Sequence, residues 1–63
     1  MLSSNLKRIR EKQGLSQQKL SDISGVARNT ISLIEVNKRI SPGINIIKSL
    51  AEALNITVEE LIK

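Results

Sequence analysis

Apolar residues recur along this chain at helical spacing, and Gly, Asn, Ser and Pro interrupt them at short intervals. The first helix is predicted over about 4–13, with Ser3 or Ser4 as its N-cap. Gly14 ends this helix, and the apolar Leu15 closes over its end. No stretch alternates apolar and polar residues as a strand would, so the pattern predicts an all-α chain.

Two short helices are predicted next, close together in the chain. The second begins after the N-cap Ser16 and ends at Gly25, with Leu20 and Ile23 facing inward. The third covers about 28–36. The residues expected to face inward, at i, i+4 and i+7, are Ala27, Ile31 and Ile34. The helix is expected to end at Asn37.

Two further helices have recognisable ends. Ser41 and Pro42 predict the N-cap and first helical position of the fourth, and Asn55 predicts its end. Thr57 and Glu60 have the spacing of a capping box for a fifth, short helix. The inward residues are expected to be Ile44, Ile47, Leu50, Ala51 and Leu54 in the fourth helix, and Val58, Leu61 and Ile62 in the fifth.

Composition limits how these helices are held together. The chain has 63 residues, enough for one domain over 1–63, and it contains no Cys, His, Phe, Trp or Tyr. Disulfides are therefore excluded, and so is most metal, redox and nucleophilic chemistry. The sequence therefore predicts an aliphatic core, no cofactor and no enzymatic activity. The adjacent carboxylates of Glu59 and Glu60 are better explained by a helix N-terminus than by a catalytic pair.

Charge is unevenly distributed along the chain. Residues 1–48 carry nine basic and three acidic side chains, whereas residues 49–63 carry one basic and three acidic side chains. The cationic part favours a polyanionic partner, although charged residues can also simply solvate helix faces. The apolar runs are far shorter than the ~20 residues of a membrane-spanning helix. No signal-peptide pattern opens the chain, which predicts a cytoplasmic protein without a membrane partner.

The second and third predicted helices have the spacing of a helix-turn-helix. Only Ser24, Gly25 and Val26 separate them. Arg can pair with guanine, Asn with adenine, Ser with several base edges, and Leu can contact a thymine methyl group. Residues of these four types lie together on the outward face of the third helix. The alternative interpretation is that this is an ordinary solvated helix face that happens to include one leucine. They are Arg28, Asn29, Ser32 and Leu33.

A longer pattern runs through nearly the whole chain. It consists of LSQQKL at 15–20, Gly25, Val26, Thr30, Ile31, Ser32, Ile34, Glu35, the run Asn37, Lys38 and Arg39, Pro42, LAEAL at 50–54 and VEEL at 58–61. This pattern closely resembles the Cro and phage-repressor (lambda-repressor-like) helix-turn-helix family. Two positions depart from it, because the family commonly has Ser or Thr where this chain has Ala27, and usually Gly where it has Asn37.

The resemblance implies a compact five-helix domain that binds double-stranded DNA sequence-specifically. It further implies a transcriptional regulator, and among regulators it favours a repressor. It implies base contacts from Arg28, Asn29, Ser32 and Leu33 of the third helix, lying in the major groove. It implies phosphate contacts from Gln17, Gln18, Ala27, Thr30, Asn37, Lys38 and Arg39. The contact at Gln17 also follows from physics, since a helix N-terminus offers free N–H groups to a phosphate oxygen.

Two further expectations concern packing and assembly. Arg10 and Glu35 each lie four residues after an apolar stripe residue, so we expect them to pair between the first and third helices, as the resemblance also implies. The protein is expected to bind a palindromic operator as a homodimer. Two residues lie at the edge of the apolar stripe on the fourth helix, Ile46 and Ala53. They could either extend an apolar surface towards a second copy of the chain or fill the edge of the core.

Several roles remain open. Within DNA binding they are a phage repressor or Cro, an antitoxin regulator, a restriction-modification controller, or the head of a longer regulator. A helical protein-interaction module is the main rival, but it leaves the polar face of the third helix unexplained. Binding of single-stranded RNA is disfavoured because the chain has no aromatic ring on which a base could stack. The sequence suggests no small-molecule site.

Overall fold

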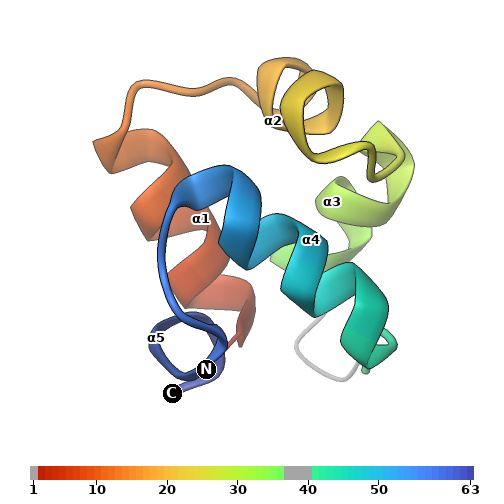
Figure 1. The fold of residues 1–63 in the computed structure, drawn as a ribbon. Helices are drawn as coiled ribbons and strands as arrows, with labels where there is room; N and C mark the ends of the chain where they lie inside the picture. Colours follow the sequence, from red (N-terminus) through yellow and green to blue (C-terminus); the bar gives the residue numbers. More distant parts are fainter. Residues whose placement is uncertain (1, 37–40) are drawn as a thin grey trace.

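The computed structural model describes residues 2–36 and 41–63, and its regular elements are all α-helices (Figure 1). The all-α, five-helix prediction is confirmed. The helices, in chain order, are α1 (Leu2–Lys12), α2 (Gln17–Ser24), α3 (Arg28–Val36), α4 (Ile44–Leu54) and α5 (Val58–Ile62).

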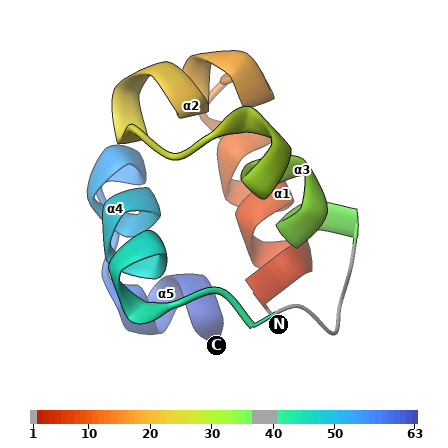
Figure 2. The same ribbon diagram turned by 90° about the vertical axis from the view of Figure 1, so that its right-hand side faces the viewer.

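The helices surround one aliphatic core. Figure 2 shows α2 across the top, α1 and α3 on one side, and α4 with α5 on the other. Burial of these apolar side chains is the main favourable contribution to folding, because each removes its surface from water. The buried cluster consists of Leu6, Leu20, Val26, Ile31, Ile34, Leu50, Ala51, Leu54 and Leu61, so every helix contributes to it.

Most helix ends lie where their local chemistry predicts. Gly14, Gly25 and Asn55 adopt left-handed backbone conformations at the ends of α1, α2 and α4. Thr57 and Glu60 form the predicted capping box at the start of α5. These ends, together with the N-cap Ser16, fix the lengths of the short helices.

Two helix starts differ from the prediction. The helix α1 begins at Leu2, before either serine, because Leu2 packs against the core and Ser3 is itself buried within the helix. The N-cap of α4 is Gly43 rather than Ser41, and its carbonyl accepts the backbone N–H of Ile46 at 3.1 Å. Pro42 therefore precedes α4 and is not its first residue.

Four residues predicted to face inward are instead exposed. Ile23 and Ile62 are about half exposed, and Ile44 is 60% exposed. Each lies in a terminal turn of its helix, where fewer neighbouring elements cover it. Ala27 is exposed because it precedes α3 and lies outside its buried stripe.

Polar side chains join the helix ends across long sequence separations. The Asn5 amide donates to the carbonyl oxygens of Leu61 at 3.1 Å and Lys63 at 2.8 Å. The Gln13 amide donates to the carbonyl oxygen of Leu54 at 2.7 Å. Both side chains satisfy carbonyls at a helix C-terminus, where no partner exists within the helix, and they attach α5 and α4 to α1.

Candidate nucleic-acid interface

The turn between α2 and α3 is held by its own side chains. Gly25 adopts φ 76°, and its N–H donates to the Ser21 carbonyl. The Ser21 hydroxyl donates to the carbonyl oxygen of Val26 at 2.6 Å, and the Ser24 hydroxyl accepts the N–H of Val26 at 3.1 Å. Val26 is buried in the core. The turn therefore presents α3 at a fixed orientation relative to α2, and the sequence did not reveal the roles of Ser21 and Ser24.

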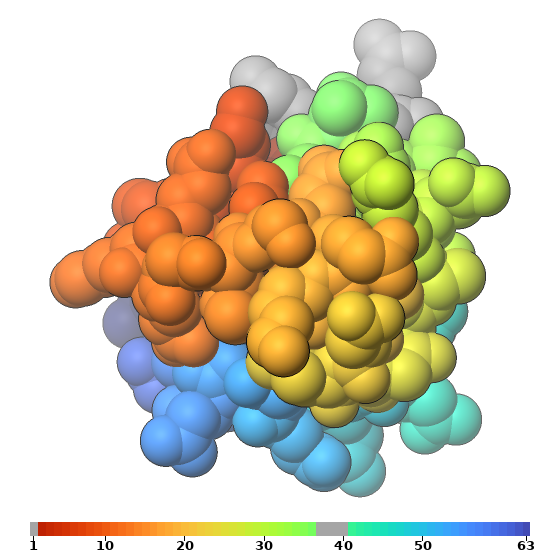
Figure 3. Space-filling view, turned by 90° about the horizontal axis from the view of Figure 1, so that it is seen from above, coloured from red at the N-terminus to blue at the C-terminus, as the bar shows by residue number. Residues whose placement is uncertain are grey.

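The outward face of α3 carries the predicted base-reading residues. Arg28, Asn29 and Leu33 are exposed, with Leu33 51% exposed, and Ser32 is half-buried. The opposite face places Ile31 and Ile34 in the core. Figure 3 shows the side chains of α3 along the outer edge of the molecule, beside those of α2. The four polar and apolar groups thus share a surface that a ligand can reach.

The first turn of α2 carries two glutamines that were predicted to contact phosphate. Ser16 accepts the N–H of Lys19 at 3.0 Å, which caps one of the free donors at this helix end. The Gln18 amide donates to Asp22 at 3.0 Å, and the Gln17 amide donates to Glu35 at 3.0 Å. A primary amide has two N–H donors, so each glutamine retains a second one for another acceptor.

The other predicted phosphate contacts fall in two places. Ala27 is exposed before α3, and its carbonyl accepts the N–H of Ile31 at 3.1 Å. Thr30 is half-buried in the first turn of α3. The remaining three, Asn37, Lys38 and Arg39, lie outside the described residues.

Arg10 and Glu35 form a bidentate ion pair between α1 and α3. Arg10 Nε donates to Glu35 Oε2 at 2.7 Å and Arg10 Nη2 donates to Oε1 at 2.9 Å. Their side chains are 9% and 2% exposed, respectively. Arg10 Nη1 also donates to the carbonyl oxygen of Leu15 at 2.7 Å, and Gln17 donates to the same carboxylate from α2. The network therefore connects α1, α2, α3 and the turn after α1.

This network shifts the acid–base equilibria of both partners. The hydrogen bond to Glu35 raises the pKa of Arg10 above its ordinary value. Burial alone would raise the pKa of Glu35, but the hydrogen bonds from Arg10 and Gln17 outweigh burial and lower that pKa below its ordinary value. The carboxylate is consequently charged at neutral pH, as a paired buried acid should be.

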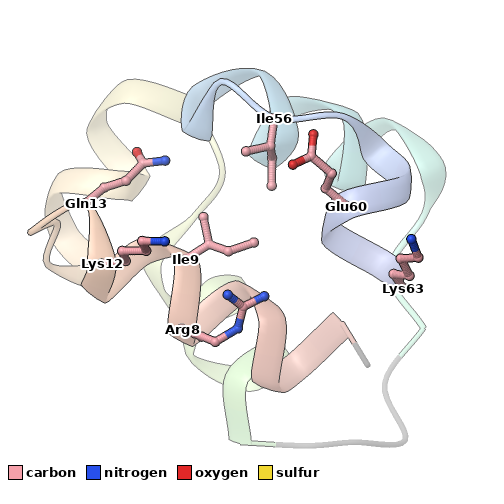
Figure 4. A pocket seen from close by; sticks show the side chains of 7 residues that line it. All are labelled: Arg8, Ile9, Lys12, Gln13, Ile56, Glu60 and Lys63. Carbon is pink, nitrogen blue, oxygen red and sulfur yellow. The ribbon is translucent and has the colours of Figure 1, made fainter.

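A groove lies between α1 on one side and the segment from the α4–α5 connection to the end of α5 on the other (Figure 4). Figure 4 shows Ile9 and Ile56 pointing towards each other across it. Two of its polar groups already serve the fold, because Gln13 caps α4 and Glu60 belongs to the capping box of α5. Within the described ranges, no cluster of acidic side chains is arranged to hold a metal ion. Gln13 and Glu60 thus help to hold together the helices that border the groove.

Comparison with known proteins identifies the family. A family profile described as Helix-turn-helix matches residues 6–61. The chain belongs to this helix-turn-helix family. The resemblance to the Cro and phage-repressor family, seen in the sequence, is confirmed. Over the part of the chain that the structure describes, no helix is long and apolar enough to cross a membrane.

Two relatives are similar over most of the chain. The HTH-type transcriptional regulator PuuR of Escherichia coli (strain K12) is 36% identical over 55 residues, which cover 87% of this chain and 29% of PuuR. The HTH-type transcriptional regulator SinR of Bacillus subtilis (strain 168) is 29% identical over 62 residues, which cover 98% of this chain and 56% of SinR. The chain thus spans only part of each relative, and both relatives are described as regulators, in agreement with the predicted non-enzymatic role.

Solved structures of SinR have the same fold. A crystal structure of SinR, the master regulator for biofilm formation, in complex with DNA matches with a TM-score of 0.93 at 28% identity, over 100% of both chains. The solution structure of the N-terminal DNA-binding domain of SinR from Bacillus subtilis matches with a TM-score of 0.86, over 100% of this chain and 91% of that one. These SinR structures thus share the five-helix arrangement described above.

We expect removal of either partner of the ion pair to destabilise the fold strongly. Arg10→Met or Glu35→Gln leaves the other charge buried without its partner, which should lower the free energy of unfolding by about 3 to 5 kcal/mol. Urea unfolding followed by circular dichroism measures this decrease. Arg8→Met, at an exposed position on α1, is the matched control and should change stability by less than about 0.5 kcal/mol. Negligible decreases for both partner variants would contradict burial of the pair.

The lowered pKa of Glu35 predicts how this stabilisation depends on pH. A carboxylate with a depressed pKa in the folded state contributes fully above its unfolded value of about 4.3, and the contribution is lost as the pH falls through the lower folded value. The gap in melting temperature between the wild-type protein and Glu35→Gln should therefore be largest near neutral pH and shrink below about pH 4.3. Glu52→Gln, at an exposed site on α4, should follow the wild type. A gap that stays constant down to strongly acidic pH would refute the lowered pKa.

Proposed function

We propose that this chain binds double-stranded DNA sequence-specifically, with α3 in the major groove. It serves as the DNA-binding part of a transcriptional regulator, and a repressor is the role we favour. The observation that carries the proposal is the outward face of α3, where Arg28, Asn29 and Leu33 are exposed on a helix whose orientation is fixed. The SinR structure with DNA, which matches this chain along its whole length, supports the same conclusion.

The chemistry of this face suits base recognition. The major groove is about 12 Å wide and admits an α-helix, and each base pair presents a distinct set of donors and acceptors there. Arg28 and Asn29 lie in the first turn of α3, the part of a recognition helix that enters the groove. Arg28 can donate two bonds to guanine, and Asn29 can bond adenine through both donor and acceptor. Ser32 and Leu33 follow one turn later and add a hydroxyl and an apolar tip.

Backbone contacts would position this helix rather than specify sequence. The first turn of a helix has backbone N–H groups without a partner inside the helix, and such groups can bind a phosphate oxygen. Gln17 is the first residue of α2, and its amide retains a second N–H beyond the one bonded to Glu35. Because Glu35 holds the other N–H of Gln17, the ion pair that stabilises the fold also orients this phosphate contact. We assign further phosphate contacts to Gln18, Ala27, Thr30, Asn37, Lys38 and Arg39.

Substitutions should separate base reading from positioning. Against a site selected from random duplex DNA, Arg28→Ala or Asn29→Ala should cost about 1 to 3 kcal/mol of binding free energy and little on random DNA. Lys38→Ala or Arg39→Ala should weaken binding to all duplexes and reduce the slope of log affinity against log salt by about one for each phosphate that the variant no longer neutralises. Fluorescence anisotropy titrations at several salt concentrations measure both effects.

Arg8→Ala is the matched control for Arg28→Ala, because it removes the same charge from an exposed position on α1, away from α3. It should leave sequence preference unchanged. Equal decreases in affinity for all these variants on every DNA sequence would reject α3 as the reading helix and leave only non-specific electrostatic binding.

We also propose that two copies bind a palindromic site, with half-sites about 34 Å apart or a multiple of that distance. Ile46 and Ala53 are half-buried and pack against the core. Both residues are therefore better explained as the edge of the core than as a dimer surface. Dimerisation on DNA therefore rests on the symmetry of the operator rather than on these side chains. Sedimentation of the complex should give two chains per palindromic duplex, and one chain per duplex at saturation would contradict it.

A further inference from the structure

Two apolar side chains occupy the second half of the outward face of α3. Val36 is 73% exposed and Leu33 is 51% exposed. They are three residues apart on one helix, so their side chains are neighbours. Arg28 and Asn29, by contrast, give the first turn of the same face polar groups. The face therefore changes from polar to apolar along the helix.

Among the described residues, Val36 belongs neither to the buried core nor to the partly buried residues that pack against it. With 73% of its surface exposed, it gains little from burial. A β-branched residue is also a poorer helix former than Leu, Lys, Gln or Glu, so helix propensity does not favour valine at an exposed position. Scattered exposed apolar residues are common, but here two adjoin the polar groups of one proposed interface. An apolar group of the ligand would account for both.

We propose that Leu33 and Val36 together contact thymine methyl groups, which makes Val36 a further specificity-determining residue. The inference rests on the proposed function, because it requires α3 in the major groove. Among the base edges exposed there, the thymine C5 methyl is the apolar group. Residues 28 and 36 are separated by about 12 Å along the helix axis at 1.5 Å per residue, a length comparable to the width of the groove. The half-site should accordingly have purines under the first turn and thymine under the last.

Replacement of thymine by deoxyuridine tests this contact directly, because it removes the methyl group and keeps the hydrogen-bonding edge. The probes are duplexes of the selected site with single deoxyuridine substitutions. The wild-type protein should bind about three- to fivefold more weakly when a contacted thymine is replaced, the value expected for one buried methyl group. Val36→Ala should bind the unmodified site more weakly and become insensitive to deoxyuridine at one of those positions. Its melting temperature should stay close to that of the wild type.

Ile44→Ala is the matched control, because Ile44 is also a largely exposed aliphatic residue but lies on α4. It should retain both the affinity and the sensitivity to deoxyuridine of the wild-type protein. Equal sensitivity of the wild type and Val36→Ala at every thymine, with sequence-specific binding preserved, would overturn the role of Val36 and leave the proposed function standing. Absence of preference for any duplex sequence would reject the proposed function and this inference with it.

Discussion

The bidentate ion pair between Arg10 and Glu35 is the constraint on which the arrangement of the first three helices depends. Aliphatic packing is not directional, and a core of Leu, Ile, Val and Ala tolerates small shifts of one helix against another. A buried ion pair tolerates them poorly, because its hydrogen bonds need defined distances and angles and a broken bond leaves a desolvated charge. Here the bonds reach α1, α3 and, through Gln17, α2. The pair therefore sets the register in which the aliphatic residues pack.

The same network links folding to the proposed contact with DNA. Glu35 accepts bonds from Arg10 and Gln17 through one carboxylate, and that carboxylate lies on α3. The end of α2 that we propose to contact phosphate and the face of α3 that we propose to read bases are thus both held by this one carboxylate. The turn bonds of Ser21 and Ser24 add a second attachment between the two helices. Pre-organisation of this kind reduces the ordering that binding would otherwise require.

Local chemistry made much of the fold predictable from sequence. Ser16, Gly25, Asn55 and the pair Thr57 and Glu60 act on backbone groups within a few residues of themselves, so their spacing is sufficient to place helix ends. The outward orientation of the candidate reading residues followed from the helical period, because Ile31 and Ile34 fix which side of α3 is buried. The predicted DNA contacts themselves depend on a partner and stay predictions.

Features that depend on tertiary packing were not predictable in the same way. The period assigns Ile23 and Ile44 to an inward face, but it does not say whether a neighbouring helix extends far enough to cover them. The start of α1 depends on Leu2 reaching the core, and that of α4 on the carbonyl of Gly43 rather than on the serine and proline before it. The bond from Asn5 to Leu61 joins residues 56 positions apart, and no local pattern indicates it.

The division of α3 into two faces has an evolutionary consequence. Ile31, Ile34 and Glu35 carry its contribution to the core and the ion pair, while Arg28, Asn29, Leu33 and Val36 have largely exposed side chains. Exchanges on the exposed face alter little of the energy that keeps the chain folded, since surface substitutions usually change stability only slightly. If α3 reads DNA as proposed, single substitutions on its exposed face can change the preferred operator without unfolding the domain.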